Sequence, residues 1–229
     1  MKTCEEWSRE FDLMYSNITS NQAPGLTEYE KSVFLTRAQE AVVVMLYNGT
    51  LSKSFEETEE LTAYLAPLVK QATISSSVSL GTPGIVHVIP NSQIFKLPDD
   101  LLFRTLELCK VSDPNCGDRD VIVVPVTQDE YWRTARNPFK KPNAEKALRL
   151  SYDSQEGQNR YSELIGSGTI KAYTVRYIRK PEPIILEDLS QDGFSINGET
   201  SAKTCKLNEH LHQTILTEAV KAAKAVWAA

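Results

Sequence analysis

The feature that most constrains this chain is a capped amphipathic helix, predicted over residues 27–47. Thr27 and Glu30 have the spacing of a capping box, in which each side chain bonds a backbone N–H at the helix start. Apolar residues then recur at intervals of three and four, namely Phe34, Ala38, Ala41, Val42 and Met45. An apolar face of this kind has to be buried against other elements, so a helical module is expected around it.

Three further helices are predicted as its partners, over about 5–18, 57–69 and 208–229. The first carries Trp7 and Phe11 at helical spacing, and the second follows another capping-box pair, Ser54 with Glu57. Asn208 is the predicted N-cap of the last helix, whose face is rich in alanine. Small side chains allow close approach, so this C-terminal helix is expected to pack on the N-terminal ones.

Between these helices the hydrophobic period changes from helical to alternating. Strands are predicted over 85–89, 102–111, 121–124, 147–152 and 170–180, and the continuous apolar run 121–124 is typical of a strand buried on both faces. Thr127 with Glu130 predicts a short helix over 127–137, which ends at Asn137-Pro138.

The predicted fold class is therefore α+β, with N- and C-terminal helices forming a helical bundle and an antiparallel β-rich domain inserted between them. The expected divisions are 1–74 for the N-terminal helical part and 75–190 for the β-rich domain. Residues 191–229 are expected to form a loop and a C-terminal helix that packs back on the bundle.

Composition excludes several functional classes. The chain has 229 residues, 41% of them hydrophobic, and a formal charge of -5, which argues against a general nucleic-acid binder because counterion release requires a basic surface. Its four cysteines form no CxxC pair, and the start MKTCEEWSREF contains no long apolar segment. We therefore expect synthesis in a reducing cytoplasm, no signal peptide and no membrane contact.

No sequence motif indicates catalysis. GxGxxG after a strand, GxxxxGK[ST], GxSxG and HExxH are all missing from the sequence, so no cofactor and no enzyme activity are expected. His87, His210 and His212, even with Cys109 or Cys116, fit no zinc spacing, so surface histidines and buried thiols are the favoured interpretation. The carboxylates near helix starts are interpreted as favourable to the helix dipole.

One segment combines residue types that dominate protein–protein contacts. Tyr, Trp and Arg join large buried area to directional polar groups. Residues 129–141 hold such a set, and its candidate contact residues are Tyr131, Trp132, Arg133, Arg136, Lys140 and Lys141. The alternative is that Tyr131 and Trp132 plug the end of the β-domain while the basic residues are merely solvated.

A second candidate contact lies on the strand 170–180, where Tyr173 and Tyr177 share a face with Arg179. The alternative for this strand is an ordinary half-exposed sheet face.

Four stretches carry a resemblance to a known family: 10–40, 123–150, 173–186 and 205–229. The second of these reads VVPVTQDEYWRTARNPFKKPNAEKALRL and the last CKLNEHLHQTILTEAVKAAKAVWAA. Over most of its length the chain resembles the structural proteins of crAss-like phages that form head-tail connector rings, or portal adaptors, beneath the portal. The resemblance implies a non-enzymatic virion protein at the head-tail junction or tail, which forms a ring of twelve copies.

The same resemblance implies a set of partners: other copies of the chain, the portal protein and the next tail or ring protein. Genomic DNA would pass through the channel without sequence-specific binding, and the acidic balance suits a lumen along which DNA slides. The C-terminal helix is implied to dock on the portal, with Leu211, Ile215, Val226 and Trp227 as candidate docking residues. Alternatives are another ring or tail-hub component, or a virion-associated hydrolase built from distant histidines and carboxylates.

Overall fold

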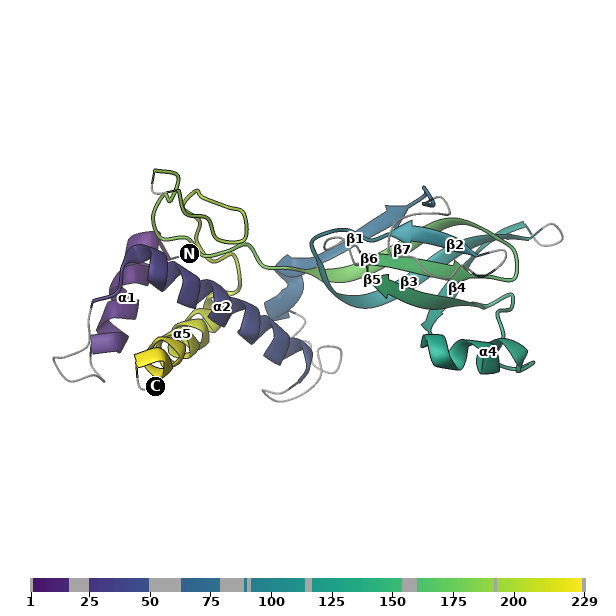
Figure 1. Cartoon of the computed structure of the whole chain (residues 1–229), viewed down its shortest axis with the longest axis horizontal. Helices are drawn as coiled ribbons and strands as arrows, with labels where there is room; N and C mark the ends of the chain where they lie inside the picture. Colours follow the sequence, from purple (N-terminus) through teal and green to yellow (C-terminus); the bar gives the residue numbers. More distant parts are fainter. Residues whose placement is uncertain are drawn as a thin grey trace. The chain divides into compact units, whose positions relative to one another are not determined.

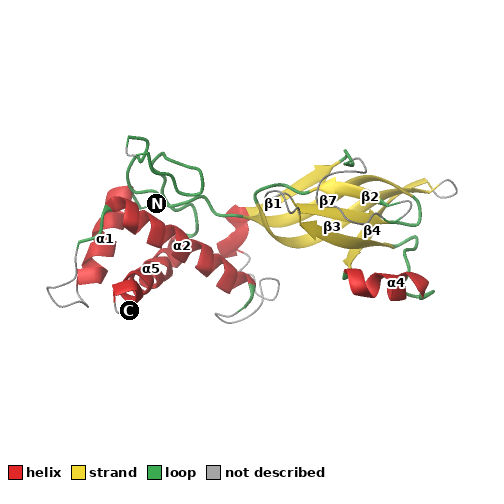
Figure 2. Cartoon of the chain, in the orientation of Figure 1, coloured by secondary structure: helices red, strands yellow, loops and turns green. Residues whose placement is uncertain are grey.

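The computed structural model describes residues 2–16, 25–49, 63–78, 89, 92–113, 117–153, 160–191 and 193–227. The chain is mixed α+β, with helices at both ends of the sequence and a curled seven-stranded sheet between them (Figures 1 and 2). It divides into two compact units. We call residues 1–68 with 180–229 the helical unit, and residues 69–179 the β unit.

Helix α2, Glu28–Tyr47, begins where the sequence predicted it. The Thr27 hydroxyl accepts from the Glu30 amide at 3.3 Å, and the Thr27 amide donates to the Glu30 carboxylate at 2.8 Å, so the capping box is confirmed. Because both side chains satisfy backbone donors at the helix start, the first turn is fixed locally, before any packing.

The buried face of α2 differs from the predicted one. Phe34, Ala41 and Met45 are only half-buried, whereas Leu35 and Val43 are fully buried. The reason is that α2 contacts α1 (Cys4–Ser16), α5 (His212–Trp227) and the chain after the sheet, so its covered arc is wider than one apolar stripe. Ala38 and Val42 are buried as predicted, so hydrophobic spacing located part of the buried arc and missed its wider extent.

Polar side chains of α2 bind an extended stretch of chain that follows the sheet. The contacts pair Ser32 with Leu186, Thr36 with Ile184 and Gln39 with Glu182. Thr36 and Ile184 exchange two bonds, because the Thr36 hydroxyl donates to the Ile184 carbonyl at 3.2 Å and accepts from its amide at 3.1 Å. These pairs, the α2 ladder, satisfy backbone groups that would otherwise be buried without partners.

The first and last helices begin close to their predicted positions, and their predicted last residues, 17–18 and 228–229, lie outside the described residues. Helix α1 buries Trp7, Phe11 and Tyr15, and the Trp7 ring packs against His212 with centroids 4.9 Å apart. Before α5, the Asn208 side chain caps the short helix η2 (Glu209–Leu211) by accepting from a backbone amide. Both α1 and α2 contact α5.

The helix predicted over 57–69 is corrected at its end. Residues 63–65 are α-helical and η1 covers Ala66–Leu68, but Val69 already begins strand β1. Leu65 and Leu68 are buried as expected, while the predicted start of this helix and the strand predicted at 85–88 lie outside the described residues.

The sheet runs in the order β1-β7-β3-β4-β5-β6-β2. The strands are β1 (Val69–Ile74), β2 (Gln93–Lys96), β3 (Leu101–Asp113), β4 (Gly117–Pro125), β5 (Lys146–Asp153), β6 (Arg160–Ile165) and β7 (Thr169–Arg179). The expectation of an antiparallel sheet is corrected at one place, since β4 and β5 pair in parallel. Parallel neighbours require a crossover, and the chain between them supplies it with helix α4, Gln128–Arg136.

Each face of the sheet carries its own apolar cluster. The inner cluster includes Val121, Val123, Tyr173 and Val175, while the outer one joins α4 to β5 and β6. Strand β4 is therefore not buried on both faces as predicted. Its alternate residue Ile122 is 59% exposed. The outer cluster contains residues of α4, β2, β5 and β6 but none of β4, so this side of β4 stays open to solvent.

Candidate interaction surfaces

Helix α4 begins at the predicted position but without the predicted capping box. Thr127 is the N-cap residue, yet its side chain makes no capping hydrogen bond. The Thr127 hydroxyl bonds the Asp129 carboxylate instead and, together with backbone N–H groups, lowers the pKa of Asp129. Glu130 is bound to Arg133 at 2.6 Å rather than to the backbone of Thr127. Because Thr127 and Glu130 bond other side chains, the predicted capping box does not form.

The aromatic pair on α4 is divided between core and surface. Tyr131 is buried in the outer apolar cluster of the sheet, together with Leu148 of β5. Trp132, whose ring lies edge-on to Tyr131 with centroids 5.2 Å apart, is 53% exposed. Tyr131 therefore anchors α4 to the sheet, and Trp132 faces outward from this anchored helix.

The turn after α4 is held in place by hydrogen bonds. The Asn137 side chain accepts from the Phe139 amide at 2.9 Å, and its carbonyl accepts from the amides of Lys140 and Lys141. The Lys146 ammonium donates to the Phe139 carbonyl at 2.6 Å. The ring of Phe139 is nevertheless 88% exposed. Phe139 and Trp132 are thus two large apolar side chains that this helix and turn leave exposed.

Basic side chains surround these exposed rings. Arg136, Lys140 and Lys141 are exposed and form no ion pair with any residue that the structure describes. We define the α4 surface as Trp132, Arg133, Arg136, Phe139, Lys140 and Lys141. Sequence reasoning missed Phe139, although its position between Pro138 and two lysines in a turn was an available signal.

The tyrosines of β7 lie elsewhere than expected. Tyr173 is fully buried and donates its hydroxyl to Glu107, while Tyr177 is buried and donates to Asp100 at 2.8 Å. Arg179 is half-buried. This differs from both sequence interpretations of a partly exposed face, because the Tyr-x-Val-x-Tyr side of β7 faces the interior of the curled sheet. These tyrosines are thus held by the core of the β unit.

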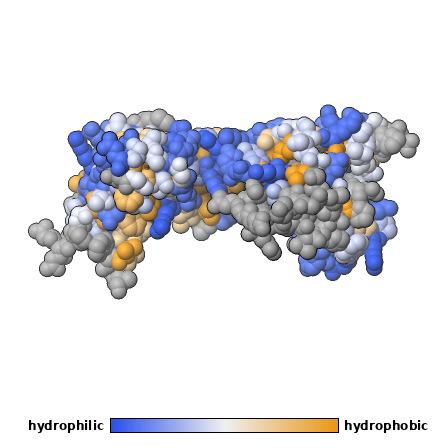
Figure 3. Space-filling model, turned by 45° about the horizontal axis from the view of Figure 1, so that its top comes forward, coloured by the Kyte–Doolittle hydropathy of each residue, from blue (hydrophilic) through white to orange (hydrophobic). Residues whose placement is uncertain are grey.

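The four candidate docking residues of the C-terminal helix also differ in burial. Leu211 and Ile215 are buried within the helical unit, so neither side chain is available at its surface. Val226 is 63% exposed, and Figure 3 shows hydrophobic residues gathered over the C-terminal end of α5. Trp227 is the last residue of α5, and its side chain lies outside the described part of the chain.

Two buried carboxylates in the β unit have partners on several sides. Glu107 lies 3.2 Å from the Arg149 guanidinium and accepts from Tyr173, and burial raises its pKa. Glu163 is fully buried and accepts from the Tyr152 hydroxyl at 2.6 Å. Carboxylates engaged in this way hold neighbouring elements of the β unit together.

The helical unit contains an open groove of about 460 Å³. Its lining comes from α1, α2 and the chain after the sheet, and consists of Cys4, Glu5, Ser8, Arg9, Glu28, Leu186 and Glu187. We call it the acidic groove, because three of these residues are glutamates and one is a cation.

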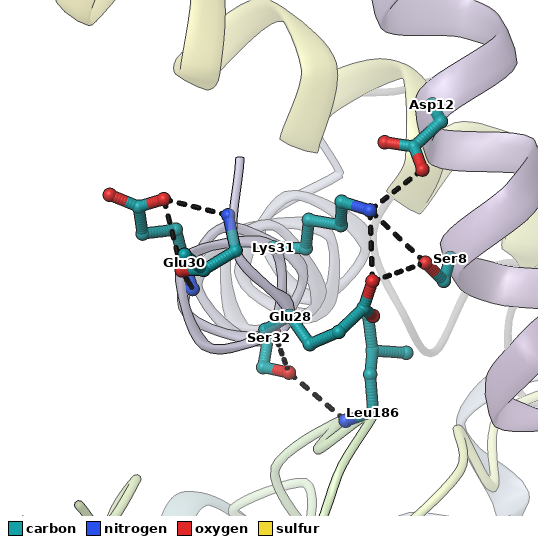
Figure 4. A network of polar contacts seen from close by, with 8 residues as sticks. Ser8, Asp12, Glu28, Glu30, Lys31, Ser32 and Leu186 are labelled. Atoms are coloured by element: carbon teal, nitrogen blue, oxygen red, sulfur yellow. Dashed lines mark hydrogen bonds and ion pairs between the residues drawn. The ribbon is translucent and has the colours of Figure 1, made fainter. Parts of the chain in front are cut away.

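A buried lysine supports one wall of this groove (Figure 4). The Lys31 ammonium donates to Asp12 at 2.7 Å, to Glu28 at 3.0 Å and to Ser8 at 3.1 Å, so it ties α2 to α1. Burial opposes its charge, but the hydrogen bonds and charges of the two carboxylates outweigh that effect and raise the pKa of Lys31.

The histidines and acidic residues form no metal site among the described residues, since no three His, Cys, Asp or Glu side chains are grouped to hold an ion. His212 is buried, which lowers its pKa, while His210 lies exposed on η2 and His87 is outside the described residues. In the part of the chain that the structure describes, no helix is both long and apolar enough to cross a membrane.

Comparison with known proteins identifies the family. A family model described as phage tail ring protein 3/4 matches residues 1–228. Ring protein 3 of Bacteroides phage crAss001 is 38% identical over 227 residues, which cover 96% of this chain and 94% of that protein. Ring protein 4/5 of the same phage is 35% identical over 229 residues, covering 97% and 92%. Because the family model matches residues 1–228, the chain belongs to the phage tail ring protein 3/4 family.

Proposed function

We propose that this chain is a non-enzymatic subunit of a ring in the head-to-tail connector of a crAss-like phage. In this role the ring docks on the portal, extends the DNA channel and links the capsid to the tail. The observation that carries the proposal is the match of the ring-protein family model over residues 1–228. Twelve copies would match the symmetry expected of a portal partner.

The surfaces of the chain suit this role. A closed ring is built from heterologous contacts, in which one patch of each copy meets a different patch of the next. The α4 surface offers exposed aromatic and basic residues at one place, and the acidic groove offers a different kind of surface at another. The two buried carboxylates of the β unit, Glu107 and Glu163, are engaged by neighbouring side chains, which favours a structural role for them.

A second candidate position for this chain is a ring at another level of the tail, further from the portal. It is favoured by the similar identities, 38% and 35%, to two relatives that carry different ring numbers. A ring placed further from the portal would contact another ring instead of the portal, while its own subunit contacts would remain of the same kind.

Purified chain mixed with the portal protein tests the proposal. We expect mass photometry and negative-stain images to show a ring bound to the portal, whereas the free chain remains small or forms rings alone. If ring formation occurs only with a tail protein, the second position is supported. If the chain stays monomeric with every connector and tail protein of the phage, the ring function is contradicted.

A further inference from the structure

The two units of the chain carry opposite net charges. The β unit has 15 Lys and Arg against 12 Asp and Glu, whereas the helical unit has 10 against 18. Like units therefore repel each other and unlike units attract, within the screening distance of physiological salt. In a ring with heterologous contacts, this charge division favours the β unit of one copy beside the helical unit of the next.

The α4 surface is the place on the β unit best prepared for such a contact. Arg136, Lys140 and Lys141 are exposed without a described ion-pair partner, and in the sequence they flank Phe139, which is 88% exposed. Tyr131 fixes the helix to the sheet, so these side chains are displayed from a rigid base. Rigid display reduces the entropy that binding must overcome.

The acidic groove is the complementary place on the helical unit. Glu5 and Glu187 are exposed at its lining, and Leu186 contributes an apolar side chain. Glu28 is already bound by Lys31. Glu5 lies 3.7 Å from the Arg9 guanidinium, and both side chains are more than four-fifths exposed, so this weak surface pair is open to exchange with a cation from outside. Glu187 forms no ion pair with any residue that the structure describes. A volume of about 460 Å³ is sufficient for an aromatic ring with a neighbouring basic group.

We infer that the α4 surface of one copy binds the acidic groove of the next copy, with Phe139 entering the groove and Arg136 and Lys140 pairing with Glu5 and Glu187. The occupant is thus a second copy of this chain, and the inference rests on the proposed ring function. An aromatic residue within a ring of ion pairs is the arrangement typical of an interface hot spot.

Charge reversal on each side tests this contact in the full chain. One variant carries Arg136→Glu with Lys140→Glu, and the other carries Glu5→Lys with Glu187→Lys. Each alone is expected to weaken subunit association about thirty-fold or more in sedimentation experiments, which corresponds to the loss of one hot spot. Mixing the two variants is expected to restore association, because in a ring of alternating copies each reversed surface meets the reversed complement and each native surface meets the native one.

Two further variants make the outcome specific. Phe139→Ala, which changes no charge, is expected to weaken association at least ten-fold while the melting temperature stays within about 2 °C, because the ring makes little contact inside its own unit. Lys110→Glu with Arg176→Glu reverses two exposed cations on β3 and β7 of the same unit and serves as the matched control. This control is expected to associate like the native chain.

The results separate this contact from the ring function itself. If the native chain forms rings and the reversal and Phe139→Ala variants form them equally well, the proposed contact is wrong. The ring function would then still stand. Reversal variants that are weakened but not rescued on mixing also overturn it. If the Arg136→Glu, Lys140→Glu variant still forms rings but no longer binds a short DNA duplex that the native chain binds, the α4 surface contacts DNA and not the next copy. Native chain that never assembles contradicts the function and not only the contact.

Discussion

Replacing Thr36 by valine tests whether the α2 ladder holds the helical unit together. Valine keeps the volume and branching of threonine but removes the hydroxyl that bonds both the amide and the carbonyl of Ile184, at 3.1 and 3.2 Å. Both residues are buried, so water does not replace the lost partner. Leaving a buried N–H and a buried C=O unsatisfied costs about 1–3 kcal/mol each, and we expect a total loss of about 2–4 kcal/mol.

Urea unfolding measures this loss within the helical unit. The chain has three tryptophans, and replacing Trp132 and Trp227 by phenylalanine leaves Trp7, which is fully buried in that unit, as the fluorescent probe. With a slope of about 1.5 kcal/mol per molar urea, the midpoint should fall by about 1.3 M or more. Thr217→Val is the matched control, because the Thr217 hydroxyl donates only to the Gln213 carbonyl one turn earlier in α5.

We expect the control to shift the midpoint by less than about 0.3 M. Equal midpoints for Thr36→Val and Thr217→Val would refute the reasoning, since the ladder would then contribute no more than an ordinary surface hydroxyl. Native-state hydrogen exchange at the Ile184 amide provides a second measurement. Its protection should fall in Thr36→Val and remain unchanged in the control.

Other substitutions give further expected outcomes. Gly168→Ala should destabilise the β unit by about 1–3 kcal/mol in thermal unfolding, because its Cβ would lie 2.5 Å from a backbone oxygen of β3, whereas Gly25→Ala has open space. Thiol labelling at pH 8 should modify Cys4 well before Cys109, since burial raises the pKa of Cys109 to about 12; equal rates would contradict this burial. Because the folded-state pKa of Lys31 is raised, its stabilisation is present below about pH 10 and is lost as pH rises further, so Lys31→Met should flatten the alkaline fall in stability seen by circular dichroism.

The sequence predicted the positions of helices and strands better than it predicted which of their faces are buried. The capping box of α2 was correct because its signal lies entirely within four residues. The buried arc of α2 was not, because Thr36 and Gln39 are buried by bonds to a segment almost 150 positions later, which hydrophobic spacing does not reveal. On β4, four apolar residues in a row indicated burial on both faces, yet Ile122 is exposed.

The candidate surface was predictable in part. Exposed Trp132 and its basic neighbours were identified from residue type alone, but the burial of Tyr131 beside it depends on the sheet to which α4 is anchored. For β7, period-two spacing placed Tyr173 and Tyr177 on one face without indicating that the curl of the sheet encloses this face. Sheet curvature arises from the whole strand order, so no local pattern encodes it.

The pairing of β1 with β7 has a consequence for how the chain bears force. Val69 lies opposite Ile178, so the strand that enters the sheet and the strand that leaves it are hydrogen-bonded neighbours over six residue pairs. Beyond β7, the outgoing chain is clamped sideways by the α2 ladder at 182, 184 and 186. Tension along this stretch would load the hydrogen bonds of the α2 ladder in shear. Several bonds would then have to break together, and not one after another. The force needed to detach this segment from α2 would therefore exceed what any one of its hydrogen bonds could withstand.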